Sequence, residues 1–175
     1  DILRQFGYAM NERRRGQALN ELADAYGILD RNSTGQQYQF DRDFSAQLKD
    51  WLDGKGKKTG TYNGEYFDLG ETPPILSKYG AASERIIMPE SVLLKIAGEK
   101  HSISVDELSK LPSQLTDPIL LFRSSYKDRL GNTKPALVAL TEMVDKYGND
   151  VIAIVHMNKY QNRIEVNKIA SVYSK

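Results

Sequence analysis

The feature that constrains this chain most is a set of short apolar or alternating segments that follow Asp117-Pro118. Two stretches between them, Asp128–Asn132 and Tyr147–Asp150, are rich in the Asn, Asp and Gly residues that hairpin turns favour. Segments of this length joined by short turns predict neighbouring antiparallel strands. We therefore expect a four-stranded antiparallel sheet. Its strands are predicted at Ile119–Phe122, Ala136–Leu140, Val151–Val155 and Ile164–Val172.

One of these segments, Val151–Val155, has no polar residue and predicts a central strand buried on both faces. Before Asp117 the apolar residues recur at helical spacing instead. Helices that precede strands predict an α+β fold, in which a helical N-terminal region is followed by helices packed on the four-stranded antiparallel sheet. The expected helices are Leu19–Tyr26, Phe44–Leu52 with Asp41 or Asp43 as its N-cap, Pro89 to about Lys100, and a short helix begun by the capping box Ser104–Glu107.

A basic, glycine-rich segment, Gly54–Gly60, follows the second expected helix. Its sequence, GKGKKTG, is typical of a flexible linker and is the best candidate for a domain boundary. We therefore expect a helical N-terminal extension and linker at residues 1–60 and a second domain at residues 61–175. The chain begins without a methionine, which we interpret as a piece of a longer polypeptide.

Composition excludes several kinds of site. The 175 residues include no cysteine, which rules out disulfides and thiolate metal ligands. With two histidines and no carboxylates at ligand spacing, we expect no metal site and no cofactor. No P-loop, GxGxxG, HExxH or GxSxG signature is present. No apolar run approaches the length of a membrane span, and the N-terminus lacks the pattern of a signal peptide, so no membrane partner is expected.

Charge is unevenly distributed, although the net charge is only +1. Residues 118–175 contain nine Lys and Arg against five Asp and Glu, whereas residues 1–117 carry an acidic excess. A basic C-terminal half favours a polyanionic partner. Ordinary surface charge is the alternative interpretation.

Two histidines are candidates for proton transfer, because the unperturbed imidazole pKa of ~6.5 lies near neutrality. His101 follows Lys100 at the expected end of its helix, four residues after Ala97 and on the same face. The alternative for His101 is a helix-end histidine stabilised by the helix dipole. His156 continues the apolar strand in register with Ile154, and we interpret it as a hydrogen-bonded core histidine.

The last predicted strand carries a second set of candidate residues. Strict alternation places Asn167, Ser171, Tyr173 and Lys175 on one face, and puts Lys168 on the other face among apolar residues. A face with amide, hydroxyl and ammonium groups is able to bind and polarise a phosphate. A solvated face of an antiparallel sheet is the alternative. Ser124, at the end of the first predicted strand, is expected to join this surface or a turn.

Several short motifs resemble, in their order and spacing, those of phage MuF C-terminal toxin domains. Leu69–Leu76 (LGETPPIL) is similar to the family's LGxTPxVL entry, and Asn167–Lys175 (NKIASVYSK) to its closing NxIxSxYxK pattern. Segments within residues 29–51 resemble sequences found before such domains in large phage proteins. The remaining motifs are Lys100-His101, Leu111-Pro112, Asp117-Pro118 and Phe122–Ser124.

The resemblance implies a ribonuclease fold of the barnase, EndoU, colicin and RelE type, in which a concave sheet face cuts RNA without a metal. The RNA 2′-hydroxyl attacks its own phosphate and leaves a 2′,3′-cyclic end. It also implies a larger phage polypeptide, a cognate immunity protein as a second partner, and action in the cytoplasm of a target cell. By position, the catalytic residues would be His101, Lys100, Ser171 and Tyr173, and the substrate-binding residues Asn167, Lys168, Ser124 and Lys175.

Two other functions fit the sequence. An ADP-ribosyltransferase-type effector would need an acidic residue in its site, and Glu142 and Glu165 are available. A non-catalytic interaction domain of a phage protein is the other, with Arg13–Arg15 exposed on its helical region.

Overall fold

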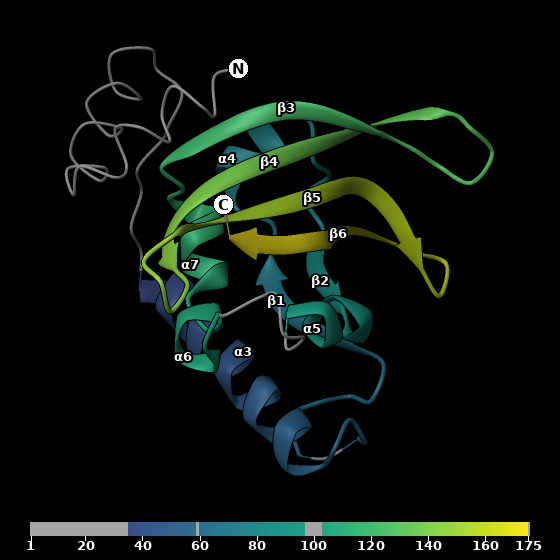
Figure 1. Cartoon of the computed structure of the whole chain (residues 1–175). Coiled ribbons are helices and arrows are strands. Elements are labelled where there is room, and N and C mark those ends of the chain that lie inside the picture. Colours follow the sequence, from purple (N-terminus) through teal and green to yellow (C-terminus); the bar gives the residue numbers. More distant parts are fainter. Residues whose placement is uncertain (1–34, 59, 97–102, 175) are drawn as a thin grey trace.

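The computed structural model describes residues 35–58, 60–96 and 103–174 (Figure 1). Their strands form one six-stranded sheet in the order β1-β2-β6-β5-β4-β3, with helices packed on it. This confirms the α+β class. The strands are β1 (Tyr66–Glu71), β2 (Arg85–Pro89), β3 (Leu120–Lys127), β4 (Thr133–Val144), β5 (Asp150–Gln161) and β6 (Ile164–Ser174). The helices are α3 (Gly35–Asp53), α4 (Pro74–Lys78), α5 (Glu90–Ile96), α6 (Val105–Leu108) and α7 (Leu111–Thr116).

Strands β3 to β6 form the antiparallel meander that the alternating segments indicated. The β3–β4 turn closes through the Asp128 N–H, which donates to the Asn132 carbonyl at 3.0 Å. The β4–β5 turn closes in the same way, from Asp145 to Asn149 at 3.0 Å. β5 is central, and Val151, the first residue of its apolar run, is fully buried.

The prediction of a four-stranded antiparallel sheet was wrong, because two further strands extend the sheet and one pairing is parallel. β1 and β2 form an antiparallel pair, and β2 runs parallel to β6. The parallel pairing joins Arg85–Ile87 to Val166–Lys168, segments about eighty positions apart. A parallel pair needs a long connection, so neither a hairpin turn nor local alternation indicates it.

The helical N-terminal region is not confirmed as predicted. Residues 1–34, with the expected helix Leu19–Tyr26, lie outside the described residues. Helix α3 begins at Gly35, so Asp41 and Asp43 lie within it and do not cap it. Instead the Asp41 carboxylate accepts the Ser113 N–H at 2.8 Å, in the first turn of α7. The short helix α6 does begin at its predicted cap, where Ser104 Oγ accepts the Glu107 N–H at 3.1 Å.

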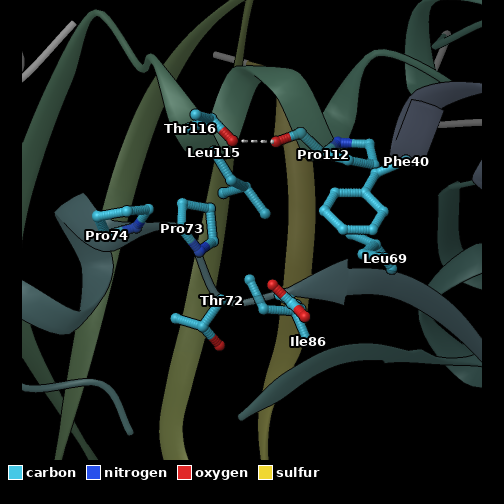
Figure 2. A pocket seen from close by; sticks show the side chains of 10 residues that line it. Phe40, Leu69, Thr72, Pro73, Pro74, Ile86, Pro112, Leu115 and Thr116 are labelled. Carbon is cyan, nitrogen blue, oxygen red and sulfur yellow. Dashed lines mark hydrogen bonds between the residues drawn. The ribbon is translucent and has the colours of Figure 1, made fainter. Parts of the chain in front are cut away.

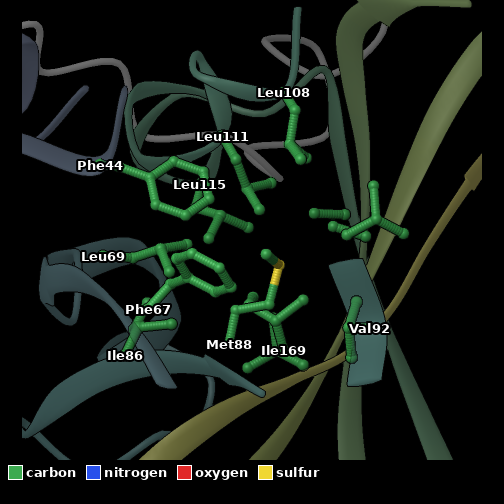
Figure 3. Close-up of a cluster of buried hydrophobic side chains, with 14 of the residues drawn as sticks. Phe44, Phe67, Leu69, Ile86, Met88, Val92, Leu108, Leu111, Leu115 and Ile169 are labelled. Atoms are coloured by element: carbon green, nitrogen blue, oxygen red, sulfur yellow. The ribbon is translucent and has the colours of Figure 1, made fainter. Parts of the chain in front are cut away.

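The main core lies between the helices and one face of the sheet (Figure 3). Phe44 and Leu48 of α3 are fully buried in the same cluster as Phe67 of β1 and Ile169 of β6. The Phe44 and Phe67 rings meet edge to face, with centroids 6.2 Å apart. The division of the chain at residues 60 and 61 stays a prediction, but α3 shares its core with the sheet.

Helix α3 also covers the outer edge of β1. The Gln47 amide accepts the Asp68 N–H at 2.7 Å and donates to the Asp68 carbonyl at 2.8 Å. These are the two backbone groups that a neighbouring strand would otherwise pair with, so the contact protects an edge of the sheet. Across the described segments, no helix is long and apolar enough to cross a membrane.

Candidate functional site

The sheet face opposite the helices is called the outer face here. Cross-strand partners in an antiparallel sheet share a face, so the register of β3 to β6 identifies its residues. At one end its side chains form a second buried cluster, whose described members come from β3 to β6 and from Ile119. That cluster is Ile119, Leu120, Leu140 and Ile152, with Phe122, Val138 and Tyr173 packed against it. Towards the β3–β4 and β5–β6 turns the outer face becomes polar.

A β-bulge in β6 changes which of its residues reach the outer face. Ile154 pairs with Ser171, whereas the next residue, Val155, pairs with Ile169, so Ala170 is the extra residue. Beyond the bulge the alternation is shifted by one position. Lys168, paired with His156, therefore lies on the same face as Ser171. The predicted separation of Lys168 from Ser171 and Tyr173 was wrong for this reason.

A second bulge, in β5, brings another lysine to the outer face. His156 pairs with Lys168, and the next pairing joins Lys159 to Val166. Asn158 within the bulge has a φ of 58°, a left-handed conformation that asparagine tolerates better than most residues. Without the bulge, alternation would turn Lys159 away from His156. With it, the Lys159 ammonium lies over the Tyr126 ring, 5.2 Å from its centroid.

The His156 imidazole stacks on the Tyr126 ring, with centroids 3.5 Å apart and planes inclined by 2°. The two residues come from β5 and β3, which are separated by β4. Ala136 of β4 is the direct partner of both His156 and Ser124, and it is 2% exposed. Its small side chain leaves room for two rings to meet above it, so the intervening strand permits the stack.

The charge of this cluster comes from Lys159 and Lys168, which are not neutralised by an ion pair within the described residues. Burial is the main cause that lowers the pKa of His156 below its usual value, and Lys159 and Lys168 lower it further. Burial and then Lys159 also lower the pKa of Lys168. Among the residues that the structure describes, neither lysine forms an ion pair. A neutral imidazole beside two ammonium groups is suited to bind an anion and to accept a proton.

The structure brings together some of the predicted site residues. Lys168, Ser171 and Tyr173 of β6 and Ser124 of β3 all lie on the outer face. Lys168 is the direct partner of His156 and Ser171 lies one pairing along the same face, whereas Tyr173 pairs with Ile152, four residues away, and packs against the buried cluster. Lys100, His101 and Lys175 lie outside the described residues. His156 itself was misinterpreted as a core histidine: it does share a face with Ile154, but it is half-buried and stacked on a tyrosine.

Asn167 lies on the opposite face from Ser171 and is fully buried. Its Oδ1 accepts the Asn158 N–H at 3.0 Å. Its Nδ2 donates to Thr72 Oγ1 and to the Ala82 carbonyl, both at 2.8 Å. These hydrogen bonds join β6 to the β5 bulge and to the segments before β2. They give Asn167 a structural role in holding these segments together.

A catalytic site shared by His101, Ser171 and Tyr173 requires the end of the helix before His101 to lie near the last strand. Helix α5 buries Val92 and Ile96 in the main core, together with Ile169 and Val172 of β6. These β6 residues face the helices, whereas Ser171 faces the other way. The packing of α5 therefore gives no support to such a shared site, and the role of His101 stays a prediction.

Other hollows lie away from the outer face, among them the following two. Figure 2 shows a small pocket of about 80 Å³, where Phe40 and Leu69 meet Pro73 and Pro112. A more open one of about 440 Å³ lies beside Asp68 and contains no histidine or lysine. In the described parts of the chain, no group of three or more His, Asp or Glu side chains is placed to hold a metal ion. The outer-face cluster of Tyr126, His156, Lys159 and Lys168 therefore offers the clearest chemistry.

Comparison with known protein families finds a match for part of the chain. The family model of the phage MuF-C-terminal domain matches residues 92–175. This segment includes β3 to β6, and therefore the whole outer-face cluster, but not α3, β1 or β2. No curated protein matches the chain, and no solved structure matches it.

Proposed function

We propose that this chain carries a metal-independent endoribonuclease of a phage effector, with the outer-face cluster as its active site. One observation carries the proposal: a histidine stacked on a tyrosine, with Lys159 over the tyrosine ring and Lys168 opposite the histidine. The family match supports the phage context, because the matched segment contains every residue of this cluster.

RNA fits the chemistry of the cluster. Lys159 and Lys168 offer two ammonium groups to a phosphate, and Ser124, Ser171 and Tyr173 offer hydroxyl groups on the same face. Aromatic rings and half-exposed apolar side chains nearby suit the flat faces of bases. The basic excess of residues 118–175 adds long-range attraction for a polyanion.

The proposed reaction is an internal transfer. The RNA 2′-oxygen attacks the adjacent phosphorus while its proton passes to the neutral imidazole of His156. The bond from phosphorus to the 5′-oxygen breaks, and that oxygen takes a proton from a second group. The products are a 2′,3′-cyclic phosphate and a 5′-hydroxyl. His101 is the proposed second group, and Lys100 is proposed to stabilise the charge of the phosphorane, as the family resemblance implies.

Each cation has a role in this scheme. Lys168 and Lys159 stabilise the charge that develops on the phosphorane oxygens, a task suited to preorganised donors. Burial is the main cause that lowers the pKa of His156, and the two lysines lower it further, so the base is neutral at pH 7. Ser171, Tyr173 and Ser124 position the phosphate.

We further propose that the domain belongs to a longer phage protein, acts in the cytoplasm of a target cell and is held inactive by an immunity protein. The two other functions have less support. Glu142 lies at the β4–β5 end of the sheet, and Glu165 lies beside the β5–β6 turn at the opposite end. Neither glutamate is paired with a residue of the outer-face cluster, so this cluster does not supply the acidic residue of an ADP-ribosyl transferase.

The test is incubation of the purified chain with labelled RNA in EDTA, followed by analysis of the new ends. The expected result is cleavage with 2′,3′-cyclic phosphate and 5′-hydroxyl ends. Cleavage that needs added Mg²⁺ or Zn²⁺ would overturn the metal-independent mechanism. Consumption of NAD⁺ without RNA cleavage would favour the transferase, and inactivity in both assays would favour an interaction domain.

A further inference from the structure

The β3–β4 and β5–β6 hairpins extend towards the same end of the molecule (Figure 1). The β3–β4 turn is closed by hydrogen bonds at Asp128–Asn132 and contains Gly131 with a φ of 81°. The β5–β6 hairpin turns at Asn162 and Arg163, with φ angles of 52° and 68°. Two consecutive residues with positive φ are the requirement of a tight two-residue hairpin. The backbone of both turns therefore has a defined conformation.

Cations continue from the cluster onto these hairpins. Lys134 of β4 pairs with Tyr126, so it lies on the outer face, and it is exposed. Arg129 and Arg163 are exposed on the two turns. Lys159 lies on the outer face as well, between His156 and the β5–β6 turn.

The acidic residues of these hairpins are directed elsewhere. Asp128 turns its carboxylate onto the N–H groups of Leu130 and Asn132, both at 2.9 Å. Glu165 pairs with Tyr160, one position from Lys159, and so lies on the opposite face. In the described part of the chain, none of the cations Arg129, Lys134, Lys159 and Arg163 forms an ion pair. Two carboxylates lie near this end: the hydrogen bond from Asn132, and to a lesser extent the charge of Lys134, lower the pKa of Asp128, and Glu65 accepts a hydrogen bond from Asn162 Nδ2 at 3.3 Å. Within the described residues, neither forms a salt bridge with the four cations.

We propose that Arg129, Lys134 and Arg163 form a track that binds the RNA strand beyond the scissile phosphate, so that the substrate is a single strand several nucleotides long. This inference rests on the proposed function. From His156 to Gln161 is five strand residues, or about 17 Å at ~3.4 Å per residue. That distance is long enough for more than one consecutive phosphate of an extended single strand.

The hairpin tips also carry exposed apolar residues, Leu130 at 85% and Ile164 at 64% exposure. Arginines beside apolar tips would also suit an anionic membrane surface. The arrangement of the cations favours RNA over a membrane, because cations lie along the sheet as well as at the hairpin tips. Lys134 and Lys159 continue them along the sheet to His156, where a phosphate is already expected.

Binding of non-cleavable 2′-O-methyl oligonucleotides of 3 and 12 nucleotides, measured by fluorescence anisotropy over a series of salt concentrations, tests the track. The double variant Arg129→Ala/Arg163→Ala removes two cations from the hairpins. The matched control Lys49→Ala/Lys95→Ala removes two exposed cations from α3 and α5, on the helix side. Both variants change the net charge equally.

The expected result is that the hairpin variant binds the 12-mer about tenfold more weakly, with a salt dependence shallower by about 1.4 for two lost phosphate contacts. The control should bind it as the parent does, and the 3-mer should show a smaller change than the 12-mer. Equal weakening by the control, or parent-like affinity and salt dependence in the hairpin variant, would overturn the track.

Two further results separate this inference from the proposed function and from a membrane role. A chain that binds the oligonucleotides along the track but cuts no RNA would refute the nuclease and leave the track intact. Sedimentation with vesicles of anionic phospholipid, lost in the hairpin variant while 12-mer binding is kept, would assign the tips to a membrane surface and overturn the track.

Discussion

His156 and Tyr126 stack face to face across an intervening strand, with ring centroids 3.5 Å apart and planes within 2° of parallel. The contact depends on Ala136, whose small side chain lies between their strands. One face of the imidazole is thereby shielded, and its orientation is fixed. A base held in this way loses little freedom when a substrate binds, which is the condition for efficient proton transfer.

The pKa of His156 should rise when the stack is removed. Burial is the main cause of its lowered pKa, so Tyr126→Ala, which opens the ring to water, should move it towards the usual ~6.5. Tyr126→Phe keeps an aromatic ring in place and should leave the pKa low. Proton NMR titration of the two imidazoles, assigned with His101→Asn, measures this. A parent His156 that titrates at or above ~6.5 would contradict the account.

The pH dependence of cleavage follows from the same shift. A general base must be unprotonated, so kcat/KM should fall as the pH is lowered through the pKa of His156. Because that pKa is below its usual value, the acidic limb of the profile should lie below pH ~6.5. In Tyr126→Ala the limb should move to higher pH together with the NMR titration. A limb that stays fixed while the NMR pKa moves would separate His156 from the reaction.

Lys168 should contribute through its charge. Lys168→Gln should lower kcat for RNA cleavage about 10²-fold, the usual loss for one donor to a developing anion. Lys168→Arg should recover part of the rate, because it restores the charge. Lys95→Gln, on α5, changes the net charge equally and serves as the control. Similar losses in Lys168→Gln and Lys95→Gln would point to non-specific electrostatics.

Asn167 should matter for stability. Asn167→Ala removes hydrogen bonds to Asn158, Thr72 and Ala82 in a fully buried position. The free energy of unfolding should fall by about 1–3 kcal/mol, the usual cost of leaving buried groups unpaired. Ser171→Ala, at a half-buried position, should change it by less than ~0.5 kcal/mol. Urea denaturation measures both, and an Asn167→Ala variant as stable as the parent would contradict the structural role of these hydrogen bonds.

Helix α3 should be integral to the folded domain. Phe44→Ala removes a fully buried ring from the main core and should cost about 3–5 kcal/mol of unfolding free energy. Leu52→Ala lies in the same helix but is 47% exposed, and it should cost far less. Thermal or urea unfolding compares the two. A small effect of Phe44→Ala would favour an independent domain that begins after the Gly54–Gly60 segment.

Local patterns were sufficient for the meander of β3 to β6. Alternation, a wholly apolar central segment and two turn sequences each act over a few residues, and all were visible in the sequence. The pairing of β2 with β6 was not visible in the sequence, because the paired segments lie about eighty positions apart and run parallel. It depends on tertiary packing, which no local period encodes.

Only part of the candidate site was predicted correctly, and the rest was missed because it also depends on contacts between distant residues. Ser171, Tyr173, Ser124 and Lys168 were identified as candidates, but the face of Lys168 was wrong. Each bulge adds one residue to a strand, and a single added residue reverses the face of everything beyond it. His156 was judged by its apolar neighbours in the same strand, whereas its environment is set by Tyr126, thirty positions earlier.

The most direct test of the central claim compares single-turnover RNA cleavage by the parent chain and by His156→Ala, in EDTA. The variant should remain folded, as checked by circular dichroism and thermal unfolding. The account predicts a rate about 10²–10⁴-fold lower, the usual contribution of a positioned acid or base. A folded His156→Ala variant that cleaves RNA at the parent rate would show that the outer-face cluster is not the active site.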